Sequence, residues 1–169
     1  MNFSVVRYGN VMFSRGSVIP HFISNKNKGF LDITDPNMTR FSITVEEGVN
    51  AVIWALKNSI GGEILVPKIP SYRITDLAKA ICSKCKLNII GVRPGEKIHE
   101  EMIPISDSLK TVDLGKYYAI LDFDILSSYN YYKKNYKKHF IKKEFSYSSD
   151  KNINFLTVKQ LRDLINKNI

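Results

Sequence analysis

Between residues 44 and 60 the apolar positions fall on a single helical stripe: Val45, Val49, Val52, Ile53 and Leu56. A capping box of Thr44 and Glu47 opens this predicted helix, and Gly61-Gly62 ends it. The apolar stripe, the capping box and the two glycines together make this the most clearly predicted element of the chain.

Three further helices are predicted from weaker patterns. One follows Gly16-Ser17 and ends in the polar loop 25–29, and Pro20 lies in its first turn, where proline is tolerated. A second is capped by Ser71, and the last opens with a capping box of Thr157 and Gln160. Their apolar faces are Val18, Ile19, Phe22 and Ile23; Ile74, Leu77, Ala78 and Ile81; and Leu161, Leu164 and Ile165.

Strands alternate with these helices. Short strands are predicted at residues 3–8, 63–66 and 117–121, and residues 87–92 form a near-continuous apolar run typical of a strand covered on both faces. Residues 93–103 are predicted to be strand-like or irregular after the Pro94-Gly95 turn. This alternation predicts an α/β fold without internal repeats.

Composition fits a soluble globular protein. The 169 residues are 44% apolar and 24% charged, enough for one domain with a core. No stretch approaches the roughly 20 apolar residues of a membrane helix, and the N-terminus is too short and polar for a signal peptide. We therefore expect a cytoplasmic protein with no membrane partner.

The net charge of +9 is unevenly distributed. Six lysines lie in the Lys/Tyr-rich run near residues 129–143, which we expect to be part of a basic loop spanning 126–145. Tyrosines interleaved with lysines suit nucleic-acid binding, whereas a solvated basic loop explains the same pattern without a ligand. We favour the second interpretation.

Cys82 and Cys85 form a C-x-x-C motif. Such a pair is half of a zinc site or a redox pair, but the three histidines are isolated and offer no comparable ligand spacing. The sequence favours two thiols at a helix end, and we expect no metal.

Polar residues follow several of the apolar segments. Asn10 and Arg93 each follow an apolar strand, and Arg40 follows the Asp-Pro-Asn turn in "ITDPNMTRFSIT". Ligands of open α/β sheets bind beyond the carboxyl ends of strands, and guanidinium groups match phosphate oxygens. Arg15 and Ser17, just before a helix, add to an anion-binding site. Each arginine taken alone also fits a surface salt bridge.

Four blocks carry a resemblance to a known family: "FSVVRYGNVMFSRGSVIPHF", "ITDPNMTRFSIT", "GGEILVPKIPSYRITDLAKAI" and "IIGVRPGEKIHEEMI". In this order they resemble the C-terminal half of the inverting UDP-N-acetylglucosamine 4,6-dehydratases, which are extended short-chain dehydrogenase/reductases. Related epimerases typically carry histidine where this chain has Pro94. The resemblance therefore favours the dehydratases.

The resemblance implies a fold made of the last Rossmann strands and a substrate-binding subdomain. It divides the chain into a nucleotide-sugar-binding region at 1–125, the basic loop at 126–145, and a tail and helix at 146–169. It also implies roles for individual residues. The implied substrate contacts are Asn10, Arg15, Ser17, Arg40, Arg93, Glu96 and Lys97, and Val11 is the implied neighbour of the nicotinamide. Arg40, among apolar neighbours, would have its charge completed by a ligand phosphate. Glu96 and Lys97 equally fit a structural ion pair.

Two departures from the family pattern matter. Phe13 stands where the family has a small residue, and the chain contains no G-x-x-G-x-x-G loop. Tyr129 and Lys133 form a Tyr-x-x-x-Lys string in the basic run, which we interpret as coincidental because no strand or helix is predicted there. The catalytic pair and most of the NADP site would belong to a missing N-terminal region, so no catalytic residue is assigned here.

The resulting hypothesis is the UDP-N-acetylglucosamine-binding portion of an NADP-dependent dehydratase, a lyase, inactive by itself. It would dock onto a separately encoded N-terminal half, and a homo-oligomer is possible. The alternatives are an inactive nucleotide-sugar-binding remnant, or a nucleic-acid-binding module acting through 129–143.

Overall fold

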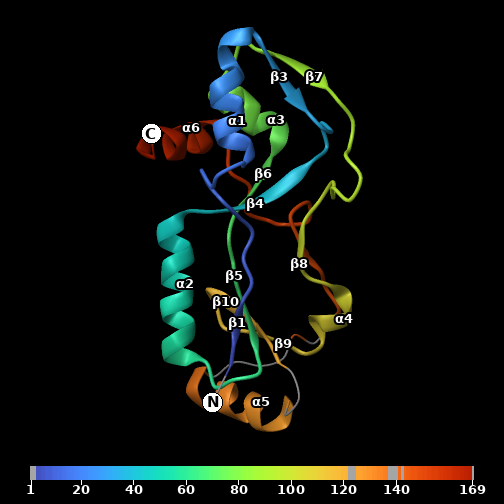
Figure 1. Ribbon diagram of the computed structural model, residues 1–169. Coiled ribbons are helices and arrows are strands. Elements are labelled where there is room, and N and C mark those ends of the chain that lie inside the picture. Colours follow the sequence, from blue (N-terminus) through green and yellow to red (C-terminus); the bar gives the residue numbers. More distant parts are fainter. Residues whose placement is uncertain (1–2, 122–124, 137–140, 142, 169) are drawn as a thin grey trace. The chain divides into compact units, whose positions relative to one another are not determined.

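The computed structural model describes residues 3–121, 125–136, 141 and 143–168 (Figure 1). The chain forms two compact units that interleave along the sequence, whereas the sequence analysis divided it sequentially. Unit 1 comprises Met1–Tyr8, Val45–Lys68 and Glu101–Ser148. Unit 2 comprises Gly9–Thr44, Ile69–Glu100 and Ser149–Ile169.

Unit 1 is built on a four-stranded sheet in the order β1-β5-β10-β9. Its strands are β1 (Val5–Val6), β5 (Ile64–Pro67), β10 (Tyr117–Ile120) and β9 (Thr111–Asp113). β1 runs parallel to β5, and β10 is antiparallel to both β5 and β9. A separate ribbon pairs β8 (Glu101–Ile103) with β11 (Tyr147–Ser148), and the short helix α4 (Ile105–Ser108) follows β8.

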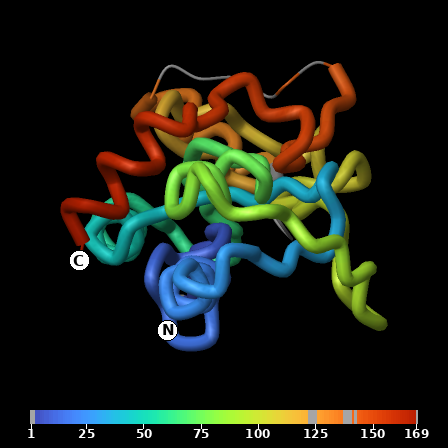
Figure 2. The backbone as a smooth tube through the Cα atoms, turned by 90° about the horizontal axis from the view of Figure 1, so that it is seen from above, coloured from blue at the N-terminus to red at the C-terminus, as the bar shows by residue number. Residues whose placement is uncertain are grey.

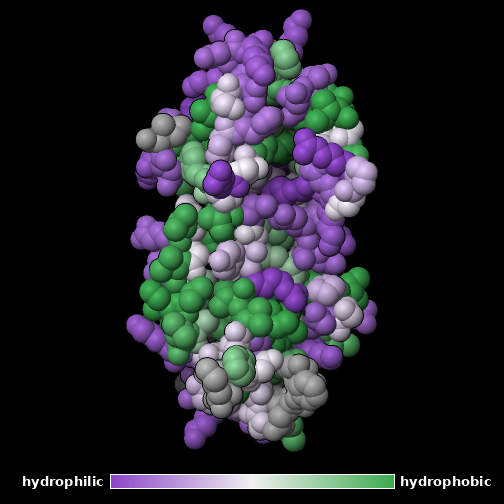
Figure 3. Space-filling model, viewed as in Figure 1, coloured by the Kyte–Doolittle hydropathy of each residue, from purple (hydrophilic) through white to green (hydrophobic). Residues whose placement is uncertain are grey.

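The helix α2 (Val45–Asn58) connects back to β5 and lies alongside the strands of unit 1 in Figure 1. It buries only small residues, Gly48, Ala51 and Ala55. The apolar stripe predicted from the sequence is exposed: Val45, Val49, Val52, Ile53 and Leu56. Figure 3 shows this apolar surface over α2. The expected helix is confirmed, but its large apolar side chains lie outside the core.

The run expected to be a basic loop contains the helix α5 (Ile125–Tyr136). The loop prediction is wrong there because aromatic residues anchor the segment to unit 1. Tyr132 is fully buried, and its hydroxyl donates to Glu63 Oε1 at 2.8 Å. The Tyr129–Lys133 string therefore lies on a helix after all, with Lys133 Nζ 5.8 Å from the Tyr129 ring centroid. Residues 137–140 and 142 of the basic run lie outside the described residues.

Unit 2 contains two small sheets. In the first, the order is β2 (Asn10–Val11), β4 (Thr39–Ile43) and β6 (Ser71–Arg73), with β2 parallel and β6 antiparallel to β4. In the second, β3 (Phe30–Ile33) runs parallel to β7 (Lys86–Ile89). The short strand expected at residues 3–8 is present only as β1, and β2 begins beyond that range at Asn10.

The core of unit 2 lies between these sheets and the helices α1 (Val18–Asn25), α3 (Ile74–Ile81) and α6 (Val158–Lys167). The 3-10 turn η1 (Lys26–Lys28) follows α1. Leu77 and Leu161 are fully buried where α3 packs against α6 (Figures 1 and 2). The predicted capping box of α6 is confirmed, since Thr157 Oγ1 accepts from the Gln160 N–H.

Two local predictions in unit 2 are wrong. Ser71 does not cap α3, because it is buried within β6 and the helix begins at Ile74. The strand after Cys85 is not covered on both faces either. It is β7, which is largely exposed, as is the loop that follows and extends away in Figure 2. The apolar run Leu87–Val92 therefore does not mark a buried strand here.

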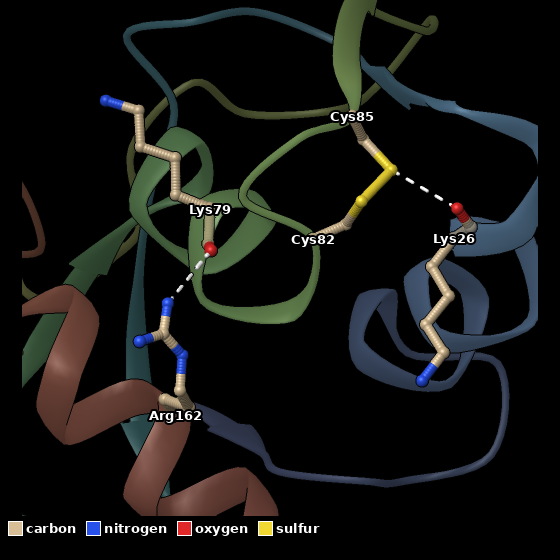
Figure 4. The surroundings of a disulfide bond; sticks show 5 residues. All are labelled: Lys26, Lys79, Cys82, Cys85 and Arg162. Carbon is tan, nitrogen blue, oxygen red and sulfur yellow. Dashed lines mark hydrogen bonds between the residues drawn. A yellow bond between two sulfur atoms is a disulfide. The ribbon is translucent and has the colours of Figure 1, made fainter.

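The two cysteines are joined as a disulfide, not free thiols as expected (Figure 4). Cys82 ends α3, and the turn through Ser83 and Lys84 returns the chain so that the two Cα atoms lie 5.4 Å apart. Both cysteines pack against the unit 2 core. The four-residue turn thus links α3 to β7.

Candidate functional site: a polar-rimmed cavity in unit 2

Unit 2 contains a cavity of about 790 Å³. This size suits a ligand of small-molecule dimensions, since such pockets typically span roughly 300–1,000 Å³. Its apolar lining comes from α1, β3 and the start of α3. Of the site residues expected from the sequence, the following line it: Asn10, Val11, Ser17, Arg40, Arg93 and Glu96. Arg15 and Lys97 do not line it, and both are exposed.

Arg40 projects from β4 and is mostly buried, with its side chain 13% exposed. Its Nη1 donates to the carbonyl oxygens of Thr39 and Ile98 at 2.8 and 2.9 Å. Its guanidinium also lies 3.7 Å from a carboxylate oxygen of Glu96 and of Glu100. Protein groups therefore already meet the charge of Arg40. The expectation that this burial requires a ligand phosphate loses its basis.

Glu100 is the central residue that sequence reasoning missed. The Asn10 side-chain amide is oriented with its nitrogen toward Glu100, and this nitrogen donates to both carboxylate oxygens of Glu100 at 2.7 and 2.9 Å. The Phe41 N–H donates to Glu100 Oε2 at 3.3 Å. Burial raises the pKa of Glu100, and the Phe41 N–H and the Arg40 charge oppose that rise. Glu100 thus holds Asn10 and Arg40 in one arrangement at the cavity edge.

Nothing in the local sequence distinguished Glu100 from Glu101 beside it, because both read as surface acids. Tyr72 was missed for a similar reason, since it lies in a strand too short to predict. Its side chain lines the cavity and is 3% exposed. Burial, and then the negative charge of Glu100, raise the pKa of Tyr72. Its hydroxyl therefore stays protonated at neutral pH.

Ser17 and Arg93 both line the cavity, and each has a polar side-chain group without a side-chain partner among the described residues. Ser17 precedes α1 as its N-cap but makes no capping hydrogen bond, and its buried Oγ has no partner among the described residues. The Arg93 guanidinium has no ion pair with the described part of the chain. Arg93 contacts Glu96 through its backbone, since its N–H donates to Glu96 Oε2 and its carbonyl oxygen accepts from the Glu96 N–H. A buried hydroxyl without a partner is unfavourable. Together with the N–H groups at the start of α1, these groups can bind an anionic oxygen.

Two further features shape the cavity wall. Val11 lines it from β2, and Phe13 in the following turn has a positive φ of 62°. That backbone region is favourable for glycine and strained for other residues. The Phe13 ring packs against the unit 2 core, which offsets the strain.

A hydrogen-bond chain secures the segment that carries Glu96 and Glu100. Thr39 Oγ1 lies 2.8 Å from His99 Nδ1 and 2.7 Å from Ser149 Oγ, and Ser149 Oγ accepts from the Glu100 N–H. This chain connects β4, the loop after β7 and the C-terminal segment. The glutamates at the cavity edge are therefore positioned by buried contacts.

Among the described residues, no group of three or more His, Cys, Asp or Glu side chains could hold a metal ion. In that same part of the chain, no helix is long and apolar enough to cross a bilayer.

The fold and the cavity define an α/β protein of the epimerase/dehydratase type among the short-chain dehydrogenase/reductases. The structure of Pen from Bacillus thuringiensis superposes with a TM-score of 0.80 and 30% identity, covering 99% of this chain and 50% of that one. A UDP-N-acetylglucosamine 4-epimerase from Methanobrevibacter ruminantium, solved with UDP-N-acetylmuramic acid, has a TM-score of 0.51 at 19% identity, over 98% of this chain and 46% of its own. The second likeness supports the fold alone.

The chain belongs to the family described as polysaccharide biosynthesis protein, whose model matches residues 1–122. It is 46% identical to an inverting UDP-N-acetylglucosamine 4,6-dehydratase of Campylobacter jejuni (serotype O:23/36, strain 81-176), over 97% of this chain and 51% of the relative. It is 40% identical to a UDP-glucose 4-epimerase of Rickettsia canadensis (strain McKiel), over 93% of this chain and 48% of that protein. The predicted fold and family resemblance are confirmed. The chain spans about half the length of these relatives.

Proposed function

We propose that unit 2 binds UDP-N-acetylglucosamine as the substrate-binding portion of an NADP-dependent, 5-inverting 4,6-dehydratase. Such a lyase would act in surface-polysaccharide or nucleotide-sugar biosynthesis in the cytoplasm. The observation that carries the proposal is that two polar groups without a side-chain partner among the described residues, Ser17 Oγ and the Arg93 guanidinium, belong to residues that line the same cavity of about 790 Å³. Both relatives are named as enzymes that act on UDP-sugars, which supports the choice of ligand.

The residues take different roles in this proposal. The diphosphate contacts Ser17, the start of α1 and Arg93, because these groups donate hydrogen bonds and Arg93 has positive charge to offer. Asn10 contacts the sugar from the end of β2. Arg40 acts as a positioning residue, since Glu96 and Glu100 already pair with it. Arg15 and Lys97, which lie outside the cavity lining, are proposed only as contacts at its outer edge.

Calorimetry with UDP-N-acetylglucosamine, UDP and free N-acetylglucosamine tests this proposal. We expect both UDP compounds to bind and the free sugar to bind far more weakly, because the diphosphate contributes the charged contacts. Arg93→Ala should weaken UDP binding by about tenfold, the loss of one charge-assisted hydrogen bond. Lys159→Ala is the matched control, and it should change the affinity by less than about twofold because this exposed lysine of α6 does not line the cavity.

Equal losses in the two variants would show a non-specific attraction to the basic chain. Absence of UDP binding to the folded chain would reject both the proposal and the alternative of an inactive nucleotide-sugar-binding remnant. Binding of UDP without turnover is expected for the chain alone. Val11 is the one NADP contact assigned here, and the chain has no glycine-rich loop that could hold a dinucleotide.

We further propose that the apolar stripe of α2 and the β1 edge dock a complementary α/β half that holds NADP and the catalytic pair. The helix α2 presents five large apolar side chains outward, and β1 is an edge strand whose free backbone groups could pair with a further strand. A helix that is apolar on both sides belongs inside a protein, between two layers. The size of the unmatched part of the relatives, about half their length, suits such a layer.

Mixing this chain with the unmatched half of the Campylobacter dehydratase tests the docking. We expect a one-to-one complex by native mass spectrometry and NADP-dependent conversion of UDP-N-acetylglucosamine. Val49→Glu should abolish the complex, because it buries a charge in the apolar stripe. Asn50→Glu adds the same charge beside it at an exposed polar position and should leave the complex intact. A dimer of this chain alone that Val49→Glu disrupts would instead show that a second copy covers α2.

A further inference from the structure

The Cys82–Cys85 disulfide lies just before the first residue of β7, whereas the cavity residues Ile90 and Arg93 follow the last residue of this strand. It joins the residue that ends α3 to the residue just before β7 (Figure 4). The intervening Ser83 and Lys84 are exposed. Cys85 Sγ lies 3.3 Å from the carbonyl oxygen of Lys26. In the disulfide this sulfur has no hydrogen to donate, whereas a Cys85 thiol could donate there. The two redox states therefore differ in a defined contact.

The surroundings of the pair are basic. No acidic residue occurs in 79–88 or in 24–31, the two segments that meet at the disulfide. They carry these cations: Lys26, Lys28, Lys79, Lys84 and Lys86. Positive charge and partial exposure favour thiolate chemistry at a cysteine and attract anionic thiols. The turn thus has the environment of an exchanging pair, not of an inert buried disulfide.

We propose that Cys82 and Cys85 form a thiol–disulfide exchange site whose substrate is a cellular dithiol or an anionic tripeptide thiol. The external thiolate attacks Cys82 Sγ, the S–S bond breaks, and Cys85 leaves as a thiolate that takes up a proton. A second thiolate, from the same dithiol or from a second tripeptide molecule, then attacks the reductant's sulfur in the mixed disulfide. Cys82 leaves as a thiolate that takes up a proton, and the two reductant sulfurs are left joined as the oxidised reductant. Cys85 is the leaving group because Cys82 ends α3, where the helix dipole disfavours an anion.

The two-stranded ribbon of β3 and β7 connects the disulfide to the cavity. β7 is held along β3 by four paired residues, from Phe30 opposite Lys86 to Ile33 opposite Ile89. The Ile90 N–H donates to the Ile33 carbonyl at the cavity, and Arg93 follows three residues later. Because β7 is largely exposed, few side-chain contacts hold it once the disulfide opens. The disulfide joins two residues that are only three positions apart in the sequence, so it constrains the unfolded chain very little. We therefore expect it to affect the local opening of β7 and not the global stability.

Hydrogen exchange of the full chain with and without a dithiol reductant tests the site directly. We expect amides 86–90 to exchange about tenfold faster on reduction, because local opening becomes easier, while β5 and β10 of unit 1 stay unchanged. The double variant Cys82→Ser/Cys85→Ser should show the same exchange rates as the reduced protein, and adding the reductant should not change them. Alkylation followed by mass measurement should trap two thiols after treatment and none before. Unchanged protection at 86–90 after both cysteines are alkylated would overturn the proposal.

The coupling to the cavity rests on the proposed function and has its own readout. UDP-N-acetylglucosamine affinity should fall by about fivefold on reduction of the wild type and stay constant in the double variant. Faster exchange at 86–90 without a change in affinity would overturn the coupling. If neither redox form binds the nucleotide sugar, the proposed function fails, while the exchange measurement still decides whether the disulfide controls β7.

Discussion

Two helices with similar sequence patterns have opposite environments in the two units. In α3 of unit 2 the apolar face is buried against the core, with Leu77 fully inaccessible. In α2 of unit 1 the apolar stripe is exposed, and Leu56 is 79% accessible. Amphipathic periodicity thus identifies a helix and its apolar face, but it does not say whether other residues of this chain bury that face. The difference indicates a core closed within unit 2 and an apolar surface left for a partner on unit 1.

Truncating one leucine in each helix tests this contrast most strongly. Leu77→Ala should lower the free energy of unfolding by about 3 kcal/mol, because it leaves a cavity in a packed core. Leu56→Ala on α2 should change it by less than about 0.5 kcal/mol, as is usual for exposed positions. Urea unfolding followed by circular dichroism measures both values. Similar losses for the two leucines would mean that the α2 stripe is covered in solution.

A glycine in unit 2 tests how closely its strands pack. A Cβ added at Gly9 would lie 2.4 Å from Phe41 Cβ, a contact that neither backbone can relieve easily. Gly9→Ala should therefore destabilise the protein by about 2 kcal/mol through overpacking. Gly16→Ala is a control for space alone, because no atom lies within 4 Å of its added Cβ, although its positive φ adds strain. A Gly9→Ala protein as stable as the wild type would contradict the close approach of β2 and β4.

Unit 1 is tested by its buried polar contact. Tyr132→Phe removes the hydroxyl that donates to the buried Glu63, and Oε2 of that carboxylate already has no partner among the described residues. We expect a loss of about 1.5 kcal/mol, the range of a hydrogen bond to a charged group. Tyr131→Phe, on the exposed side of α5, should have almost no effect. Thermal unfolding of the two variants provides the measurement, and equal melting temperatures would show that α5 is not anchored by this contact.

The smallest expected effect is a pH dependence from Glu100 in unit 2. Its folded pKa is raised above the ordinary 4.5, so the folded state binds its proton more tightly than the unfolded state. The contribution of Glu100 to stability is then present below pH 4.5 and is lost as pH rises through the folded pKa. Glu100→Gln should flatten this part of the stability–pH profile. A steeper decline with rising pH in the variant would contradict the assignment.

The sequence predicted the α/β class and most helices, and six of its eight candidate site residues line the cavity, because these depend on periodicity and on residues that follow strands or turns. It failed where tertiary contacts decide the outcome. Tyr132 turned an expected basic loop into α5, and the missing cover left the α2 stripe exposed. The ion pairs of Arg40 could not be foreseen either, because Glu100 is distant in sequence and meets β4 only after folding.

The most direct test of the account is a crystal structure of this chain with UDP. The account predicts that the diphosphate lies in the unit 2 cavity, within hydrogen-bonding distance of Ser17 Oγ and the Arg93 guanidinium, with Arg40 still paired to Glu96 and Glu100. A diphosphate bound elsewhere, or held by the lysines of α5 instead, would contradict it.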